Sequence, residues 1–190
     1  KEHEYIDLVV ARGGYGLVKA VLSQSKIPVL AHAAGGARIY IDESADLAMA
    51  EQIILNAKLS KPAACNSLDT LVVHRNVASS WLSNMVKKLK NKGVEIVSDD
   101  WDTESLGLRM SIKTVRSLEE AIEFVNYHSK GHSEGVVAND ERAIETFTKS
   151  VNTAAVFVNC STRLHDGYVF GLGSEMGIST GKLHARGPVG

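Results

Sequence analysis

The fold is decided by the stretch TLVVHRNVASSWLSNMVKKLKNKGVEIV, residues 70–97. Its first four residues, Thr70–Val73, are a β-branched and apolar run that is typical of a buried strand. Residues 77–92 then predict a helix with lysines on its outer face, and Gly93 ends that helix. Residues 94–97 predict the next strand. A strand, a helix and a second strand in this order are typical of a βαβ unit with parallel strands.

The same alternation continues outward from this stretch in both directions. The further expected strands are residues 7–10, 28–30, 38–41, 110–115, 135–137 and 154–158. The further expected helices are residues 16–25 and 47–58, one that follows the capping box of residues 117–120, and residues 140–150. The alternation predicts an α/β fold of three layers, with helices on both sides of a largely parallel sheet. Residues 160–190 hold seven glycines and are expected to form a long loop region.

Composition excludes several classes of protein. The 190 residues carry 21 basic and 22 acidic side chains, so no basic excess points to nucleic acid or to an anionic membrane. No apolar run approaches the roughly 18 residues needed to span a bilayer, and the N-terminal residues do not form a signal peptide. The two cysteines, Cys65 and Cys160, cannot make a disulfide scaffold. We therefore expect a protein of the reducing cytoplasm.

Cys65 is the first candidate for chemistry. It lies in the segment KPAACNS, residues 61–67, between an expected helix and a buried strand, and small residues surround it. A nucleophilic cysteine on this turn would need a pKa below its ordinary value of about 8.5, lowered by cations or backbone donors. The alternative is a buried, inert cysteine. No histidine flanks it, so a cysteine–histidine pair of the protease kind is not indicated.

Two further segments offer groups that could bind an anion. Residues 159–167 follow the carboxyl end of a strand, where α/β sheets commonly bind ligands, and contain Ser161, Thr162 and Arg163. The alternative is a polar turn with a capping serine. Near the C-terminus, His184 and Arg186 could hold a phosphate or carboxylate, or lie in a solvated loop.

Other motifs are excluded by their spacing. The glycines of residues 13–19 lack the Gly-Lys-Ser/Thr of a P-loop, and no glycine segment has the Gly-x-Gly-x-x-Gly spacing between a strand and a helix. The seven histidines show no spacing typical of a metal site, so no metal is expected.

Several long motifs occur in one order along the chain: YIDLVVARGG (5–14), YIDESAD (40–46), KPAACNSLDTLVVH (61–74), NCSTRLHDG (159–167) and FGLGSEMGISTGKLHARGPVG (170–190). Together they resemble the γ-glutamyl phosphate reductases, also called glutamate-5-semialdehyde dehydrogenases, of the aldehyde dehydrogenase superfamily. The resemblance runs from Tyr5 to Gly190.

The resemblance implies an oxidoreductase of proline biosynthesis. Such enzymes reduce L-glutamyl 5-phosphate with NADPH to L-glutamate 5-semialdehyde and phosphate, through a thioester on the residue that corresponds to Cys65. It further implies that Gly13, Gly14 and Glu104 bind the cofactor. The substrate would be bound by Asn66, Ser161, Thr162, Arg163, His184 and Arg186. A small-molecule substrate and a homo-oligomer are the expected partners.

The resemblance also implies a domain division and leaves alternatives open. Residues 1–30 would be the C-terminal edge of a cofactor-binding domain and residues 31–190 the catalytic domain, with most of the cofactor domain preceding Tyr5. Ala37 and Arg38 replace a Cys-His pair that the family usually carries, and the family generally has a longer stretch between Val94 and Trp101. The alternatives are another acylating aldehyde dehydrogenase, dependent on coenzyme A, and a non-catalytic scaffold.

Overall fold

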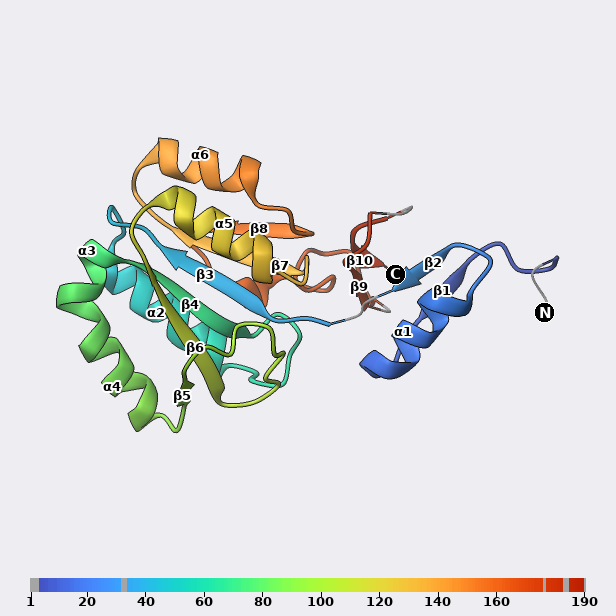
Figure 1. The fold of residues 1–190 in the computed structure, drawn as a ribbon, viewed down its shortest axis with the longest axis horizontal. Helices are drawn as coiled ribbons and strands as arrows, with labels where there is room; N and C mark the ends of the chain where they lie inside the picture. Colours follow the sequence, from blue (N-terminus) through green and yellow to red (C-terminus); the bar gives the residue numbers. More distant parts are fainter. Residues whose placement is uncertain (1–3, 32–33, 176, 183–184, 190) are drawn as a thin grey trace.

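A computed structural model describes residues 4–31, 34–175, 177–182 and 185–189 (Figure 1). Its centre is a six-stranded sheet in which every neighbouring pair of strands is parallel. The strands lie in the order β5 (Glu95–Val97), β6 (Arg109–Val115), β4 (Leu68–His74), β3 (Ala37–Ile41), β7 (Ser133–Val137) and β8 (Ala155–Val158). The α/β fold predicted from the sequence is confirmed.

Helices cover both faces of this sheet, which completes the three predicted layers (Figure 1). One face carries α2 (Leu47–Leu59), α3 (Arg75–Val77) and α4 (Ser83–Asn91), and the other carries α5 (Leu118–His128) and α6 (Glu141–Ser150). A π-helical segment, Ala78–Leu82, lies between α3 and α4 inside the stretch predicted as one helix. The helix α5 is capped at its N-terminus as the sequence predicts, because the Ser117 hydroxyl accepts a hydrogen bond from the Glu120 N–H at 3.3 Å.

The central strands are buried on both sides. In β4, Leu71 and Val73 pack into the core beneath α2 and α4, whereas Val72 between them packs beneath α5 and α6. In β3 the same alternation places Ile39 on one side and Tyr40 on the other. All five side chains are fully buried. The two strands therefore form a rigid base for the segments at their ends.

The first residues form a separate small sheet. Strand β1 (Val9–Ala11) pairs in parallel with β2 (Val29–Ala31), and α1 (Tyr15–Gln24) connects them. Figure 1 shows this unit beside the amino end of β3, away from the helices of the main sheet.

Residues 160–190 contain more regular structure than expected. A short 3₁₀ helix spans Thr162–Leu164, and β9 (Gly177–Ser179) pairs antiparallel with β10 (Gly187–Val189). The expectation of a loop throughout was wrong at these positions because three-residue strands next to glycines show no alternation of apolar side chains.

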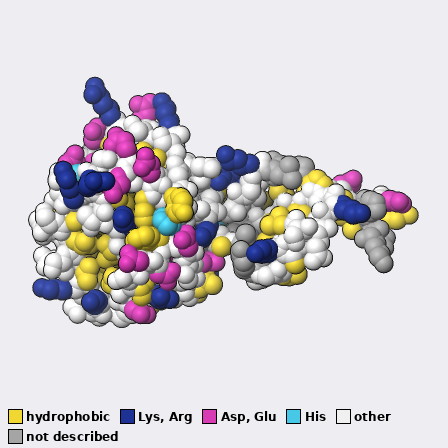
Figure 2. Space-filling model, in the orientation of Figure 1, with side chains coloured by type: hydrophobic (Ala, Val, Ile, Leu, Met, Phe, Trp, Pro, Cys, Tyr) yellow, Lys and Arg dark blue, Asp and Glu magenta, His cyan; other side chains and the backbone are white. Residues whose placement is uncertain are grey.

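The surface carries no concentrated charge on the face seen in Figure 2, where Lys and Arg are interspersed with Asp and Glu over the larger lobe. Within the described part of the chain, no helix combines the length and apolar character needed to cross a bilayer.

Candidate active site

The turn that carries Cys65 is fastened to the amino ends of β3 and β4. Inside the turn, the Ala64 N–H donates to the Lys61 carbonyl at 3.0 Å, and the Ser67 N–H donates to the Ala64 carbonyl at 2.9 Å. Across the turn, the Gly36 N–H donates to the Cys65 carbonyl at 2.5 Å, directly before β3 begins. The backbone on both sides of the sulfur is thus held by the sheet.

The segment after β8 approaches this turn from the opposite direction. It leaves the carboxyl end of β8 at Asn159, whose φ is +52°, and folds back across the sheet. The Thr162 hydroxyl then donates to the Asn66 carbonyl at 2.8 Å, and the Asn66 amide donates to the His165 carbonyl at 2.8 Å. The site was expected at the carboxyl end of a strand, and this position was wrong. The residues that follow β8 meet the cysteine turn at the amino ends of β3 and β4.

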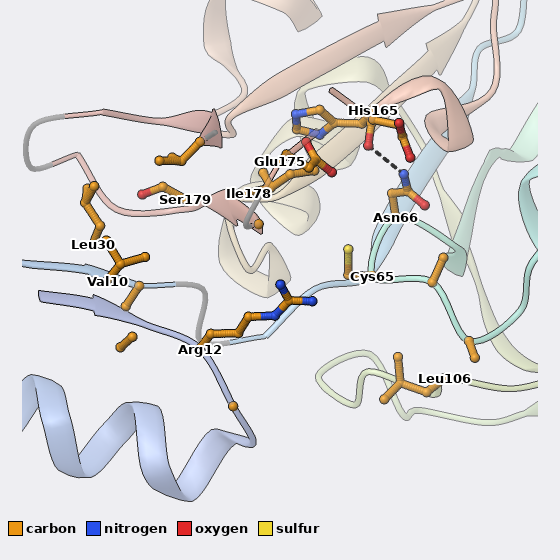
Figure 3. A pocket seen from close by; sticks show the side chains of 18 of the residues that line it. Val10, Arg12, Leu30, Cys65, Asn66, Leu106, His165, Glu175, Ile178 and Ser179 are labelled. Atoms are coloured by element: carbon orange, nitrogen blue, oxygen red, sulfur yellow. Dashed lines mark hydrogen bonds between the residues drawn. The ribbon is translucent and has the colours of Figure 1, made fainter. Parts of the chain in front are cut away.

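A cavity of about 540 Å³ opens over Cys65 (Figure 3). Its wall includes Asn66 and Arg163 beside the sulfur and Gly13 from the turn after β1. This volume is in the usual range for small-molecule sites. The cavity brings together segments that are far apart in sequence, among them the ends of β1 and β2, the cysteine turn, residues 163–166, and β9 with Glu175.

The Cys65 thiol is half-buried, and its surroundings favour the protonated form. Burial raises the pKa of Cys65, and the carboxylates of Glu104 and Glu175 raise it further. The backbone N–H of Cys65 and the guanidinium of Arg163 act in the opposite direction but do not prevail. The pKa of Cys65 is therefore not lowered, although a lowered pKa was expected for a nucleophilic cysteine on this turn.

Arg163 is the residue of its turn that reaches the cavity. Its Nη1 donates to Oδ1 of Asn66, which is itself almost fully buried. Thr162 is fully buried against the Asn66 carbonyl, and the Ser161 hydroxyl accepts the Arg163 N–H at 3.2 Å. Ser161 and Thr162 therefore hold Arg163 in place, and neither of them belongs to the described cavity wall.

Glu104 lies directly beside Cys65. A methyl group added to Gly35 would come within 2.6 Å of Glu104 Oε1 and 2.5 Å of Cys65 Cβ, so the two side chains converge on one glycine. Of the two glycines predicted to bind the cofactor, Gly13 lines the cavity, and Gly14 is the residue that precedes α1. The structure therefore brings Gly13 and Cys65 to one cavity, with Glu104 beside Cys65.

Of the two predicted residues near the C-terminus, Arg186 does not line the described cavity. Arg186 Nη1 donates to Asn152 Oδ1 at 2.8 Å, in the connection between α6 and β8, and Arg186 is absent from the described cavity wall. His184 lies outside the described residues. The second cysteine, Cys160, is half-buried and also does not line the described part of the cavity.

Sequence reasoning missed several residues of the cavity wall. Arg12 extends from the end of β1 toward Cys65 (Figure 3), and Lys61 lies in the cysteine turn itself. His165 is 1% exposed, and burial lowers its pKa to about 4, so its ring is neutral at pH 7. Its Nδ1 is 2.8 Å from the Ser133 hydroxyl. Arg12 carried a signal, since it is the cation beside the two glycines that were selected.

Comparison with known proteins gives the relatives of this chain. The chain is 44% identical over 201 residues to a γ-glutamyl phosphate reductase of Thermodesulfovibrio yellowstonii, covering 97% of this chain and 48% of that protein. It is 46% identical over 209 residues to one of Bifidobacterium longum subsp. infantis, covering 98% and 48%. The crystal structure of a γ-glutamyl phosphate reductase from Thermotoga maritima superposes with a TM-score of 0.96 at 42% identity, over 99% of this chain and 49% of that one.

The chain is thus similar, along almost its whole length, to proteins named γ-glutamyl phosphate reductase. The profile described as "Aldehyde dehydrogenase family" matches residues 92–181. A propionaldehyde dehydrogenase from Clostridium phytofermentans, 21% identical with a TM-score of 0.75, shares the fold. The chain spans about half the length of the curated relatives it matches. One alignment, with Syntrophomonas wolfei, extends over 206 positions for all 190 residues, so that relative carries segments this chain lacks.

Proposed function

We propose that this chain provides the catalytic part of an enzyme that reduces L-glutamyl 5-phosphate to L-glutamate 5-semialdehyde and phosphate, with NADPH as the reductant. One observation carries the proposal: Cys65 lies on the wall of a small-molecule cavity with Arg163 beside it, in a chain 44% and 46% identical to proteins named γ-glutamyl phosphate reductase.

The first step is the transfer of the glutamyl group to Cys65. The sulfur forms a bond to the acyl carbon, the bond from that carbon to the phosphate oxygen breaks, and the thiol proton ends on the departing phosphate. The step is balanced without an external base, so the raised pKa of Cys65 does not exclude it. The backbone N–H of Cys65 faces its own sulfur and is placed to stabilise negative charge on the acyl oxygen.

The cations of the cavity wall match a substrate with two anionic ends. Arg163 is oriented by Asn66, whereas the side chains of Arg12 and Lys61 make no hydrogen bond or ion pair with another described residue. A guanidinium binds phosphate or carboxylate with two parallel hydrogen bonds. The geometry favours Arg163 and Arg12 for these ends over Arg186, which is bound to Asn152.

The residues at the cavity mouth fit a nicotinamide cofactor. When bound, the cofactor would supply the hydride that reduces the thioester. Gly13 lets the backbone after β1 approach a bound group closely, and the Glu104 carboxylate beside Cys65 is placed to accept hydrogen bonds from ribose hydroxyls. Residues 1–30 would then be the edge of the cofactor domain, and the separation of the β1–β2 sheet from the main sheet supports that division.

The test compares Cys65→Ala with Cys160→Ala in the complete protein. NADPH oxidation with L-glutamyl 5-phosphate should be lost in the first variant and kept in the second, because only Cys65 lines the described cavity. Substrate should protect Cys65, and not Cys160, from alkylation. Full activity of Cys65→Ala would contradict the mechanism. Faster turnover of an acyl-coenzyme A would identify a different acylating dehydrogenase, and inertness toward both would indicate a scaffold.

A further inference from the structure

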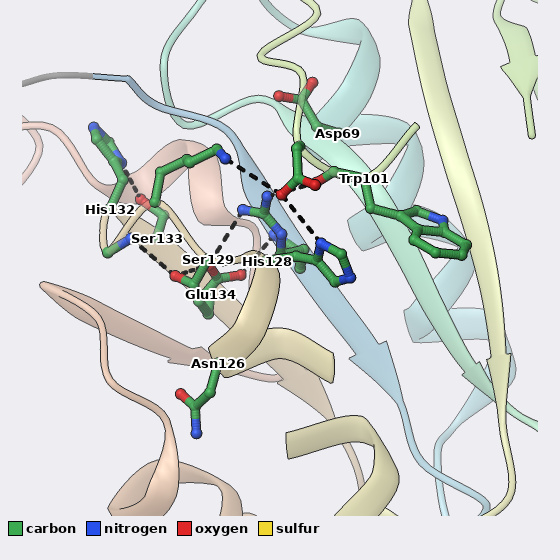
Figure 4. Close-up of polar contacts among 12 residues, drawn as sticks. Asp69, Trp101, Asn126, His128, Ser129, His132, Ser133 and Glu134 are labelled. Carbon is green, nitrogen blue, oxygen red and sulfur yellow. Dashed lines mark hydrogen bonds and ion pairs between the residues drawn. The ribbon is translucent and has the colours of Figure 1, made fainter. Parts of the chain in front are cut away.

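A buried ion pair lies behind the candidate site, at the amino ends of β3 and β7 (Figure 4). Arg38 is 1% exposed, Glu134 is 0% exposed, and the two residues are register partners. Glu134 Oε2 accepts the Arg38 N–H at 2.8 Å, and Glu134 Oε1 is 3.5 Å from the Arg38 guanidinium. The Ser129 hydroxyl donates to the same Oε1 at 2.6 Å. The pair is therefore fixed by groups of the sheet and of the segment before β7.

The guanidinium of Arg38 also reaches the loop that carries Glu104. Arg38 Nη2 donates to the carbonyl of Trp101 at 2.9 Å, three residues before Glu104. The Trp101 ring packs edge-on against Phe124 and His128, each at 5.3 Å between ring centroids. The loop between β5 and β6 is thus held at Trp101 by one buried donor and two aromatic contacts.

A second buried cluster holds the same loop on the other side of Glu104. The Ser105 hydroxyl donates to Asp69 Oδ1 at 2.8 Å, and the Ser105 N–H donates to Asp69 Oδ2 at 3.4 Å. Lys58, which is fully buried, donates to the Ser105 hydroxyl at 3.1 Å and is 3.4 Å from Asp69. Glu104 therefore lies between two anchored positions, and its carboxylate lies beside Gly35 and Cys65.

Burying such a pair is costly, and stability alone does not explain it. An arginine and a glutamate lose their hydration when they are buried, and apolar residues of similar volume often stabilise a fold equally well. Burial raises the pKa of Glu134 to about 7, although Arg38 acts in the opposite direction. What an apolar pair could not supply is the hydrogen bond to the Trp101 carbonyl.

We propose that Arg38, held by Glu134, is a positioning residue that keeps the Glu104 carboxylate against the Cys65 sulfur through the carbonyl of Trp101. The effect of Arg38 on catalysis rests on the proposed function, whereas the position of the Glu104 carboxylate relative to the Cys65 thiol does not. The charged groups that act on the pKa of the sulfur are Glu104, Glu175 and Arg163, and the other charged groups that line the same cavity are Arg12, Lys61 and Asp166. Those around the loop are Asp100 with Arg109, Asp102 with His128 and Lys130, and Lys113 over Trp101.

The test is the pH dependence of Cys65 alkylation by iodoacetamide, followed on the Cys65 peptide by mass spectrometry in the complete protein. Glu104→Gln removes a carboxylate that raises the pKa of Cys65, so the midpoint of the rate profile should move to lower pH. Arg38→Met should move it in the same direction because the carboxylate is released from the sulfur. The double variant should show no further movement. Arg116→Met, which removes an exposed arginine paired with Glu120, is the matched control and should leave the midpoint unchanged.

Each outcome bears on the proposal. A midpoint unmoved by Arg38→Met, or shifts that add in the double variant, would overturn it, as would a Glu104→Gln protein with the wild-type midpoint. If Arg38→Met does not fold, Glu134→Gln and Arg38→Lys carry the test. Glu134→Gln removes the charge that holds the guanidinium, and Arg38→Lys replaces the guanidinium with an ammonium group that lacks its fixed geometry. Loss of NADPH oxidation in all preparations, together with the predicted alkylation profiles, would refute the proposed function and leave this inference standing.

Discussion

Gly35 is the position at which one added methyl group should disable the site. It lies between the cysteine turn and the Glu104 loop, and its Cβ in a Gly35→Ala variant would be 2.5 Å from Cys65 Cβ and 2.6 Å from Glu104 Oε1. It would also meet the Cys65 carbonyl oxygen. Ordinary van der Waals contacts are 3.4–4 Å. One or both partners must therefore move by about 1 Å.

The direction of that movement follows from what each partner is attached to. Cys65 is held by its carbonyl bond to Gly36, whereas the Glu104 carboxylate is the end of a side chain with three rotatable bonds. The Glu104 carboxylate can therefore rotate away from the added methyl group, whereas the contacts with the Cys65 carbonyl oxygen and Cβ are relieved only if the backbone of the cysteine turn or of residue 35 moves. A displacement of about 1 Å at reacting groups lowers turnover by about 100-fold, and overpacking costs about 1–3 kcal/mol of unfolding free energy.

The assay measures kcat for NADPH oxidation with L-glutamyl 5-phosphate and the midpoint of the Cys65 alkylation profile in the same preparations. Gly16→Ala is the control because no atom lies within 4 Å of the added Cβ and alanine favours the helix it enters. Gly16→Ala should keep wild-type kcat. A Gly35→Ala protein with normal kcat and a normal alkylation midpoint would show that Cys65 and Glu104 do not converge as described.

Two further predictions concern other parts of the site. Arg163→Met should raise KM for the acyl phosphate by at least tenfold, whereas Arg186→Met should change it less than twofold, since only Arg163 lines the described cavity; equal effects in steady-state kinetics would contradict this. His165 has a folded pKa of about 4, below its unfolded value, so its neutral form stabilises the fold above pH 6.5 and that contribution is lost as the pH falls toward 4. Between pH 7 and 5 the free energy of unfolding should fall by up to about 2 kcal/mol more than in His165→Asn, measured by urea unfolding; equal losses would refute it.

The main sheet could be predicted from the sequence because its strands are buried on both faces. Val72 and Ile39 are buried although they lie on opposite faces of the sheet, so residues on both faces of these strands are apolar. Such strands appear in the sequence as continuous apolar runs, which can be recognised without knowing the neighbouring strands. The helix before β5 was also visible, but its π-helical segment was not. In that segment the backbone hydrogen bonds join residues five apart instead of four. This difference cannot be recognised from the spacing of apolar side chains in the sequence.

The site could be predicted only in part, for a geometric reason. Cys65 was recognisable from its own turn, and Arg163 from its neighbours. Which arginine belongs to the cavity depends on how residues 159–167 fold back over the sheet, and no local pattern records that reversal. Arg12 is 53 positions from Cys65 and reaches it only through the packing of the small sheet beside the main one.

The protonated state of Cys65 is consistent with the substrate proposed for it. A hydrolase must raise its nucleophile's reactivity because its substrate is inert, whereas an acyl phosphate is already activated and its leaving group takes up a proton as it departs. A cavity that keeps the thiol protonated without ligands also limits its oxidation, which proceeds through the thiolate. Glu175, one of the carboxylates that raise the pKa of Cys65, lines the same cavity as Arg12 and Arg163. The charge of a molecule that binds in the cavity should therefore affect the pKa of Cys65 and, with it, the reactivity of the sulfur.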